Sequence, residues 1–183
     1  AFRLSIFQVV SLQTTTGFAT TDYMLWPPYL WMLLCFAMIF GACGGSSTGA
    51  MKCGRVAILA KSIRGEFHRI LHPNAVIPVR MDGNPISQDT RATVLTFTCL
   101  YFLLIFIGWF VLMIMGLDFL EAYGISVSSI SNIGPALGTF GPAYSWNALP
   151  AAAKWLSTLL MLIGRLELFT ILLMFTTSFW KKR

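Results

Sequence analysis

The chain has 183 residues, of which 56% are hydrophobic and only 11% are charged. Average soluble domains carry roughly a quarter charged residues, so this composition excludes a disordered chain and argues against an ordinary soluble domain. The net charge is +6, but the basic residues lie between long apolar stretches rather than on a polar module, which argues against nucleic-acid binding.

The first part of the chain predicts a half-length helix followed by a membrane span. Residues 2–13 are apolar but too short to cross a bilayer, which takes about 20 residues, and they end at the polar turn QTTTGF. Residues 27–43 carry no charge and predict a span that runs into the segment GACGGSSTGA, whose glycines should break it. Because an initiator Met and a signal peptide are both lacking, we expect the chain to be a piece of a longer protein.

Basic residues concentrate in residues 52–91, which include the linker HPNAVIPVRMDGNPISQ, and at the closing Lys-Lys-Arg. Cytoplasmic loops of membrane proteins carry such an excess, so we place both segments inside the cell. His68 and His72 are four residues apart here, but Glu66 is the only nearby acid, and a solvated helix face is favoured over a metal site. The four cysteines form no CxxC pair and indicate neither a disulfide framework nor a metal site.

The second part repeats the first pattern and adds an opening span. Residues 92–117 are 26 residues without a charge and predict a transmembrane helix. Residues 121–133 predict a second half-length helix, which runs into the turn GPALGTFGP. Residues 151–180 are apolar and predict a closing span, although they include Lys154, Arg165 and Glu167. With the basic segments inside, both half-length helices fall on the outer side, together with Asp22, Asp118 and Glu121.

Two units of one kind therefore follow each other, and the first lacks its opening span. We expect an all-α integral membrane protein built of span–pore-helix–span repeats with re-entrant filter loops. Residues 1–72 hold the pore helix, filter and broken second span of one repeat. Residues 73–91 form a cytoplasmic linker, and residues 92–183 form a complete repeat.

The two turns after the half-length helices are candidate filter loops. A cation gives up its hydration shell only where oxygen atoms replace it, and channel filters supply backbone carbonyls from several symmetric loops. Each motif by itself is also typical of a polar turn, but two such motifs, matched at Gly17 and Gly134 and each followed by a span, favour a pore. The candidate filter residues are Thr14, Thr15, Thr16, Gly17, Phe18, Asn132, Ile133, Gly134 and Pro135.

Five segments, QTTTGFAT, GACGGSSTGAMK, HPNAVIPVRMDG, SNIGPALGTFGP and GRLELFTILL, together resemble the Trk/Ktr/HKT superfamily of potassium transporters, and most closely its TrkH-type pore-forming subunits. The resemblance implies four repeats around one pore, of which this chain holds most of the third and all of the fourth. It implies potassium uptake, with potassium as the substrate and no covalently bound cofactor. The residues implied to contact potassium are Thr15, Thr16, Gly17, Asn132, Ile133 and Gly134.

The resemblance also assigns a gate. It implies an intramembrane gating loop whose residues are Gly44, Gly45, Ser46, Ser47, Thr48 and Gly49. The alternative is a simple helix kink or small-residue packing between spans. Ionisable residues within a span usually face a cavity or a partner, and the resemblance places Arg165 in the pore as an electrostatic barrier. The alternative for Arg165 is a structural role in satisfying loop carbonyls.

The resemblance further implies a homodimer in the cell inner membrane, in contact with lipid and seated on a cytoplasmic ring of nucleotide-binding subunits. A second function class is a non-conducting structural or regulatory membrane subunit with the same fold. A third, an intramembrane enzyme using Arg165 and Glu167, would need a further acid or nucleophile within the span, and the sequence offers none. We therefore expect no enzymatic activity.

Overall fold

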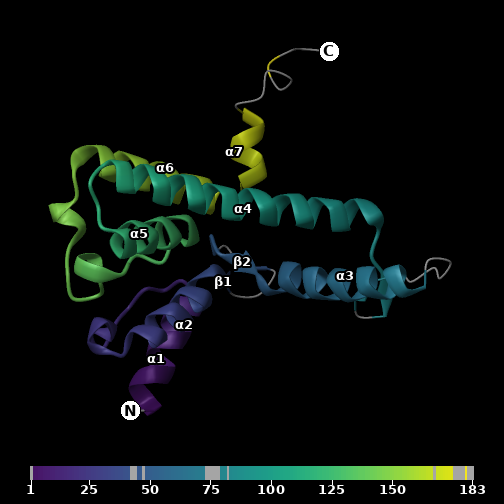
Figure 1. The fold of residues 1–183 in the computed structure, drawn as a ribbon, viewed down its shortest axis with the longest axis horizontal. Coiled ribbons are helices and arrows are strands. Elements are labelled where there is room, and N and C mark those ends of the chain that lie inside the picture. Colours follow the sequence, from purple (N-terminus) through teal and green to yellow (C-terminus); the bar gives the residue numbers. More distant parts are fainter. Residues whose placement is uncertain are drawn as a thin grey trace.

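A computed structural model of the chain describes residues 2–41, 45–46, 48–72, 79–81, 83–166, 168–174 and 180. Within these residues the regular secondary structure is almost entirely helical, and the strands are two pairs of two residues each (Figure 1). The helices are α1 (Phe2–Gln13), α2 (Pro28–Ile39), α3 (Cys53–Leu71), α4 (Gln88–Ile114), α5 (Phe119–Ser131), α6 (Ala151–Arg165) and α7 (Leu168–Met174).

Helix α4 corresponds to the span predicted for residues 92–117. Among the described residues it is the one continuous helix that is long and apolar enough to cross a membrane. It begins four residues earlier than predicted, because the Ser87 hydroxyl caps it by accepting the Thr90 N–H at 3.2 Å. Its buried residues recur every three or four positions and form a stripe that faces α5 and α6; they are Val94, Phe97, Tyr101, Ile105, Gly108 and Leu112.

Helix α5 is short, but it is the most deeply buried helix of the bundle; it packs against both α4 and α6, which lie above it in Figure 1, and against α2 on its other side. Its serines bond the neighbouring span: the Ser126 hydroxyl donates to the Ile105 carbonyl at 2.8 Å, and the Ser131 and Tyr101 hydroxyls lie 2.9 Å apart. A half-length helix and the turn after it can persist at membrane depth only where protein or water satisfies their polar groups. Here protein covers α5 on almost every side.

The closing span differs from the single helix predicted for residues 151–180. Helix α6 ends at Arg165, α7 begins at Leu168, and the two axes meet at 113°. At 1.5 Å per residue the 15 residues of α6 extend only about 22 Å, less than the roughly 30 Å of a bilayer core. Just before the end of α6, Gly164 packs closely against the end of α5, where a Cβ would collide with the Ile130 carbonyl. Glu167, 175–179 and 181–183 lie outside the described residues.

Helix α2 ends before the Gly-rich segment, four residues short of the predicted span. Strand β1 (Phe40–Gly41) follows it and pairs in parallel with β2 (Met51–Lys52), which leads directly into α3. The Cys53 thiol, directly after β2, donates to the Gly41 carbonyl of β1 at 2.9 Å. The residues directly before and directly after the Gly-rich segment are therefore held side by side.

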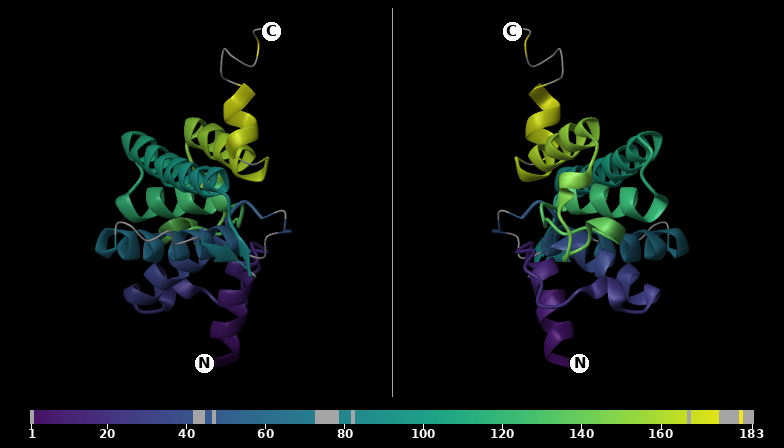
Figure 2. Two further views of the ribbon diagram at one scale, coloured as in Figure 1. Left: turned by 90° about the vertical axis from the view of Figure 1, so that its right-hand side faces the viewer. Right: turned by 90° about the vertical axis from the view of Figure 1, so that its left-hand side faces the viewer.

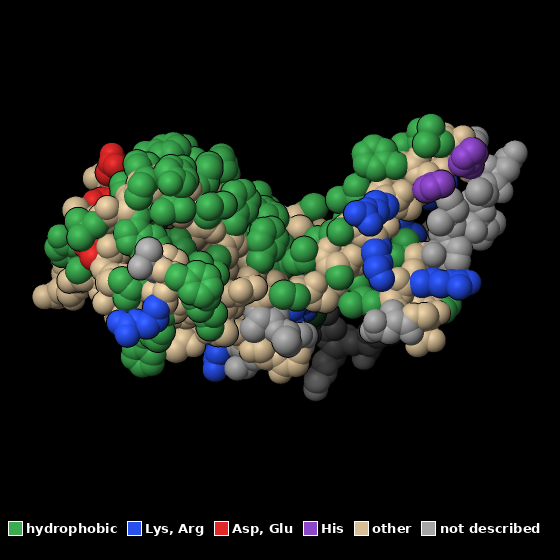
Figure 3. Space-filling model, turned by 90° about the horizontal axis from the view of Figure 1, so that it is seen from below, with side chains coloured by type: hydrophobic (Ala, Val, Ile, Leu, Met, Phe, Trp, Pro, Cys, Tyr) green, Lys and Arg blue, Asp and Glu red, His purple; other side chains and the backbone are tan. Residues whose placement is uncertain are grey.

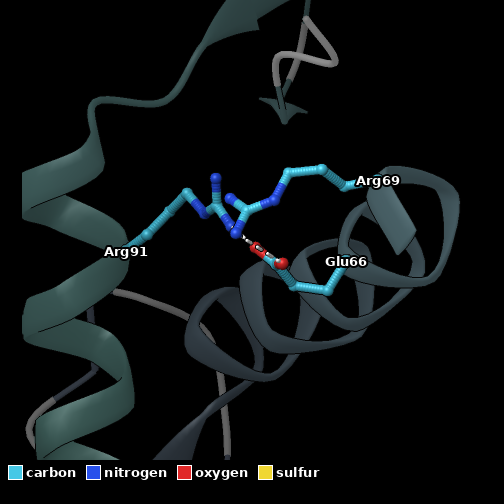
Figure 4. A network of polar contacts seen from close by, with 3 residues as sticks. All are labelled: Glu66, Arg69 and Arg91. Carbon is cyan, nitrogen blue, oxygen red and sulfur yellow. Dashed lines mark hydrogen bonds and ion pairs between the residues drawn. The ribbon is translucent and has the colours of Figure 1, made fainter. Parts of the chain in front are cut away.

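Helix α3 forms a basic arm that packs against the first part of α4 and leaves the bundle, while α1 and α7 point away at opposite ends (Figures 1 and 2). The Glu66 carboxylate binds the Arg91 guanidinium of α4 at 3.1 Å and that of Arg69 at 3.5 Å (Figure 4). Strands β3 (Arg80–Met81) and β4 (Asn84–Pro85) form a small hairpin beside the arm, where the Lys61 ammonium donates to the Arg80 carbonyl.

Candidate ion-conduction site

The turns after α1 and α5 have the same backbone geometry. Thr15 and Asn132 both take the left-handed conformation, with φ of 55° and 57°, and two residues later Gly17 and Gly134 have φ of 75° and 110°. A positive φ is uncommon outside glycine, and it is least expected for a β-branched residue such as Thr15. The same unusual bend therefore closes both half-length helices.

The hydrogen bonds of the two turns also correspond. The N–H groups of Thr15 and Asn132 donate to carbonyls three residues back, at 3.1 and 3.2 Å. Those of Thr16 and Ile133 donate to the carbonyls of the matched serines Ser11 and Ser128, at 2.9 and 3.1 Å.

These two buried serines also secure the later residues of each turn. The Ser11 hydroxyl donates to the Phe18 carbonyl at 2.6 Å, whereas the Ser128 hydroxyl accepts the Gly134 N–H at 3.2 Å. Each serine therefore links a half-length helix to the loop that follows it.

The two loops lie directly against each other. A Cβ added at Gly17 would collide with the Ile133 carbonyl and would lie 3.1 Å from Cδ of Pro135. Only glycine allows this approach of the two backbones. The structure thus brings together the two segments singled out in the sequence, with carbonyl-bearing backbone at their line of contact.

Tyr23 is a further residue at these loops, and sequence reasoning missed it. Its buried hydroxyl donates to the Ala136 carbonyl at 2.6 Å, and its own carbonyl accepts the Trp31 indole N–H at 2.9 Å. Burial, with smaller contributions from Cys35 and Asp22, raises the pKa of the Tyr23 phenol, which stays protonated as a donor. Its partner lies 113 residues away in the chain, so no local pattern points to this bond.

Part of the candidate gating loop packs against the end of α5. Of its six residues, Gly44 and Ser47 lie outside the described residues. A Cβ at Gly49 would lie 2.7 Å from the Ile130 carbonyl oxygen and 2.7 Å from Asn132 Nδ2, whereas Gly45 has open space around it. The Thr48 hydroxyl is buried, and it has no hydrogen-bond partner among the residues that the structure describes. This segment therefore reaches the base of the loop after α5, which is the second candidate filter loop.

Arg165 is the last residue of α6 and its side chain is exposed. It follows Gly164 directly, and Gly164 contacts the same Ile130 carbonyl that Gly49 contacts. Gly164, the residue before Arg165, and the candidate gating loop thus approach the end of α5 from two different elements.

An acidic hollow of about 400 Å³ lies near the loops, and Asp22, Asp118 and Glu121 help to line it. The Glu121 carboxylate accepts the Thr139 hydroxyl at 2.6 Å and the Thr139 N–H at 3.3 Å, so its charge is held in place. Acidic side chains lie at one end of the molecule, whereas several basic side chains and both histidines lie on the arm at the other end; further basic side chains lie on the same part of the molecule as the acidic ones (Figure 3). Such a hollow raises the local concentration of cations.

Known proteins resemble this chain over almost its whole length. The family model TrkH, described as a cation transport protein, matches residues 1–182. The Trk system potassium uptake protein TrkH of Halomonas elongata is 38% identical over 98% of this chain and 37% of its own length. TrkG of Escherichia coli, another Trk system potassium uptake protein, is 34% identical over 99% of this chain and 37% of its own length.

A solved structure agrees with these sequence matches. The crystal structure of the potassium transporter TrkH from Vibrio parahaemolyticus has a TM-score of 0.89 and 35% identity, and the match covers 98% of this chain and 38% of that one. The chain thus spans a little over a third of the length of the curated relatives it matches.

Proposed function

Because the chain belongs to the TrkH family of cation transport proteins, we propose that it forms part of a pore-forming subunit that takes up potassium across the membrane. The observation that carries the proposal is the pair of loops after α1 and α5, which share one bend and contact each other at Gly17 and Ile133. Because the chain spans about a third of its relatives, conduction belongs to the full-length subunit.

Family membership confirms the family predicted from the sequence. Together with the likeness to the solved transporter, it also confirms the all-α membrane fold class. The family transports cations and is not an enzyme, as predicted.

In the proposed mechanism, potassium loses its hydration shell between the loops and is coordinated by backbone carbonyls, while the threonine hydroxyls frame the path. The ligands would come from Thr15, Thr16, Gly17, Asn132, Ile133 and Gly134. Glycine at the two matched positions lets the backbone take positive φ, which a side chain would oppose at a cost of roughly 1–2 kcal/mol. Potassium is the substrate, and the proposal requires no covalently bound cofactor.

Below the filter, we propose that the segment including Gly45, Ser46, Thr48 and Gly49 gates the path, and that Arg165 adds an electrostatic barrier. The contact of Gly49 with the base of the second loop supports this assignment. Small residues can leave a helix without a steric penalty, so the segment can change shape within the membrane.

The relatives are named as proteins of a Trk system, and we infer that this subunit also works with other Trk components. We propose a homodimer in the cell inner membrane, with the basic arm and the chain's end on the cytoplasmic side, in contact with a nucleotide-binding ring. The basic residues of α3 and the acidic hollow at the opposite end support this orientation.

The test is ion competition during uptake by cells that lack other potassium systems. Gly17→Ser and Gly134→Ser in the full-length subunit should each lower the preference for potassium over sodium by about ten-fold, equivalent to about 1.4 kcal/mol. Gly83→Ser is the matched control, because Gly83 also has a positive φ, 84°, but lies in the hairpin beside the basic arm. Unchanged selectivity in both loop variants, at normal expression, would remove these glycines from the filter. Normal potassium uptake in cells whose loop variants no longer fold would show that another protein conducts, and would favour a non-conducting subunit.

A further inference from the structure

Asn132 joins α5 to the second loop, but its side chain points away from the loop. Its backbone N–H caps α5 by donating to the Ser129 carbonyl, while the side-chain amide donates to the Met161 carbonyl of α6 at 3.0 Å. A weaker bond reaches the Ile130 carbonyl at 3.3 Å. One residue thus sets the bend of a filter loop and also binds a neighbouring span.

Two glycines from other elements leave room for this amide. A Cβ at Gly49, in the gating segment, would lie 2.7 Å from Asn132 Nδ2, and a Cβ at Gly164, in α6, would lie 2.7 Å from the same atom. Both glycines also contact the Ile130 carbonyl. The amide therefore sits where the gating segment, the end of α6 and the filter loop meet.

The bend itself does not require an amide. Thr15 takes the same left-handed conformation at the matched position of the first loop, and its backbone makes the same hydrogen bond. The side chain of Asn132 is therefore free to serve a second purpose, which its bond to Met161 identifies as a connection between elements.

We propose that Asn132 is a positioning residue that couples the gating segment and the end of α6 to the second filter loop. The inference rests on the proposed function. When the gating segment moves, Gly49 moves away from the Asn132 amide and the space around the amide changes. This change alters the support of the bend that orients the Ile133 and Gly134 carbonyls. Ion selection at the loop and opening below it then depend on each other, and Arg165 shares this connection because it follows Gly164.

The test uses the full-length subunit in proteoliposomes, with potassium flux and potassium-over-sodium preference measured together. Asn132→Gly keeps the left-handed bend and removes the amide, and Asn132→Asp keeps the size but places an acceptor against two carbonyls. Each should lower the preference about five-fold, the size expected for the loss of a single hydrogen bond. Asn147→Gly is the matched control, because Asn147 is exposed and lies in the short 3₁₀ helix Trp146–Ala148 that precedes α6.

A double-mutant cycle with Gly49→Ala separates coupling from a merely structural role. Gly49→Ala crowds both the Asn132 amide and the Ile130 carbonyl. It should therefore change selectivity in the wild-type background and change it less in Asn132→Gly, where only the contact with the Ile130 carbonyl remains. Wild-type selectivity in Asn132→Gly, or fully additive effects of the two substitutions, would overturn the proposal. If Asn132→Gly does not fold, Asn132→Asp decides: normal selectivity in that variant overturns the coupling. Failure of the filter itself is recognised separately, by unchanged selectivity in Gly17→Ser and Gly134→Ser.

Discussion

The hydrogen bond from Tyr23 to Ala136 can be tested by a substitution that removes only the hydroxyl group. Tyr23→Phe deletes the hydroxyl and leaves the fully buried ring in place. The Ala136 carbonyl would then be buried without its Tyr23 donor, and a buried polar group left unsatisfied costs about 1–3 kcal/mol. Because Ala136 follows Gly134 by two residues, this cost should reduce both the stability of the subunit and the order of the second filter loop.

The measurement is the unfolding temperature of the full-length subunit in detergent, followed by potassium-over-sodium preference in proteoliposomes. Tyr29→Phe is the matched control, because Tyr29 lies on α2 and is 68% exposed. Tyr23→Phe should unfold at a lower temperature than the wild type and discriminate less well against sodium, whereas Tyr29→Phe should match the wild type in both. Equal behaviour of the two variants would refute the role of the hydroxyl in supporting the loop.

The pH dependence of this effect has a definite sign. Burial raises the pKa of Tyr23 in the folded subunit, so the contribution of the neutral phenol is fully present below the ordinary tyrosine pKa of about 10. It is lost only as the pH rises above that value. The stability difference between wild type and Tyr23→Phe should therefore be constant across the neutral range and shrink in strong alkali. A difference that already disappears near pH 8 would contradict the assignment.

Two further predictions concern charges along the path. Arg165→Ala should raise potassium flux through the reconstituted full-length subunit about ten-fold, because it removes a positive charge that repels the ion. Two unit charges about 4 Å apart repel by about 4 kcal/mol at an effective dielectric of about 20, and screening reduces this to the smaller effect expected here. Flux equal to that of the wild type would leave Arg165 a structural role. Glu121→Gln should raise the potassium concentration for half-maximal uptake about two-fold at low salt, because the hollow loses a fixed negative charge, and the effect should fade as ionic strength rises. A salt-independent change would point to the lost bond with Thr139 instead.

The helices of the second repeat could be predicted closely because their signals are local. The charge-free residues 92–117 correspond to α4, and residues 121–133 correspond to α5, which begins two residues earlier, after Asp118. The break at Arg165 could not be predicted, because it occurs where Gly164 meets the Ile130 carbonyl of a helix that is distant in sequence. The sequence is apolar on both sides of Arg165, so its composition gives no sign of the break.

The two candidate loops could be found in the sequence, but their connections to other segments could not. The motifs around Gly17 and Gly134 could be matched by eye, since each follows a half-length helix. The left-handed Thr15 could not be foreseen, because β-branched residues rarely take that conformation. The ties through Tyr23 and Asn132 depend on carbonyls of other segments, which leave no periodic trace in the sequence.

The parallel pairing of β1 with β2 has a consequence for how such transporters diversify. Since Phe40 pairs with Met51 and Gly41 with Lys52, the stretch between the strands starts and finishes at one place in the protein. Changes of length or composition within it need not displace α2 or α3, and so need not disturb the packing of the bundle. Natural selection can therefore vary this stretch while the surrounding helices stay under separate, stricter constraint.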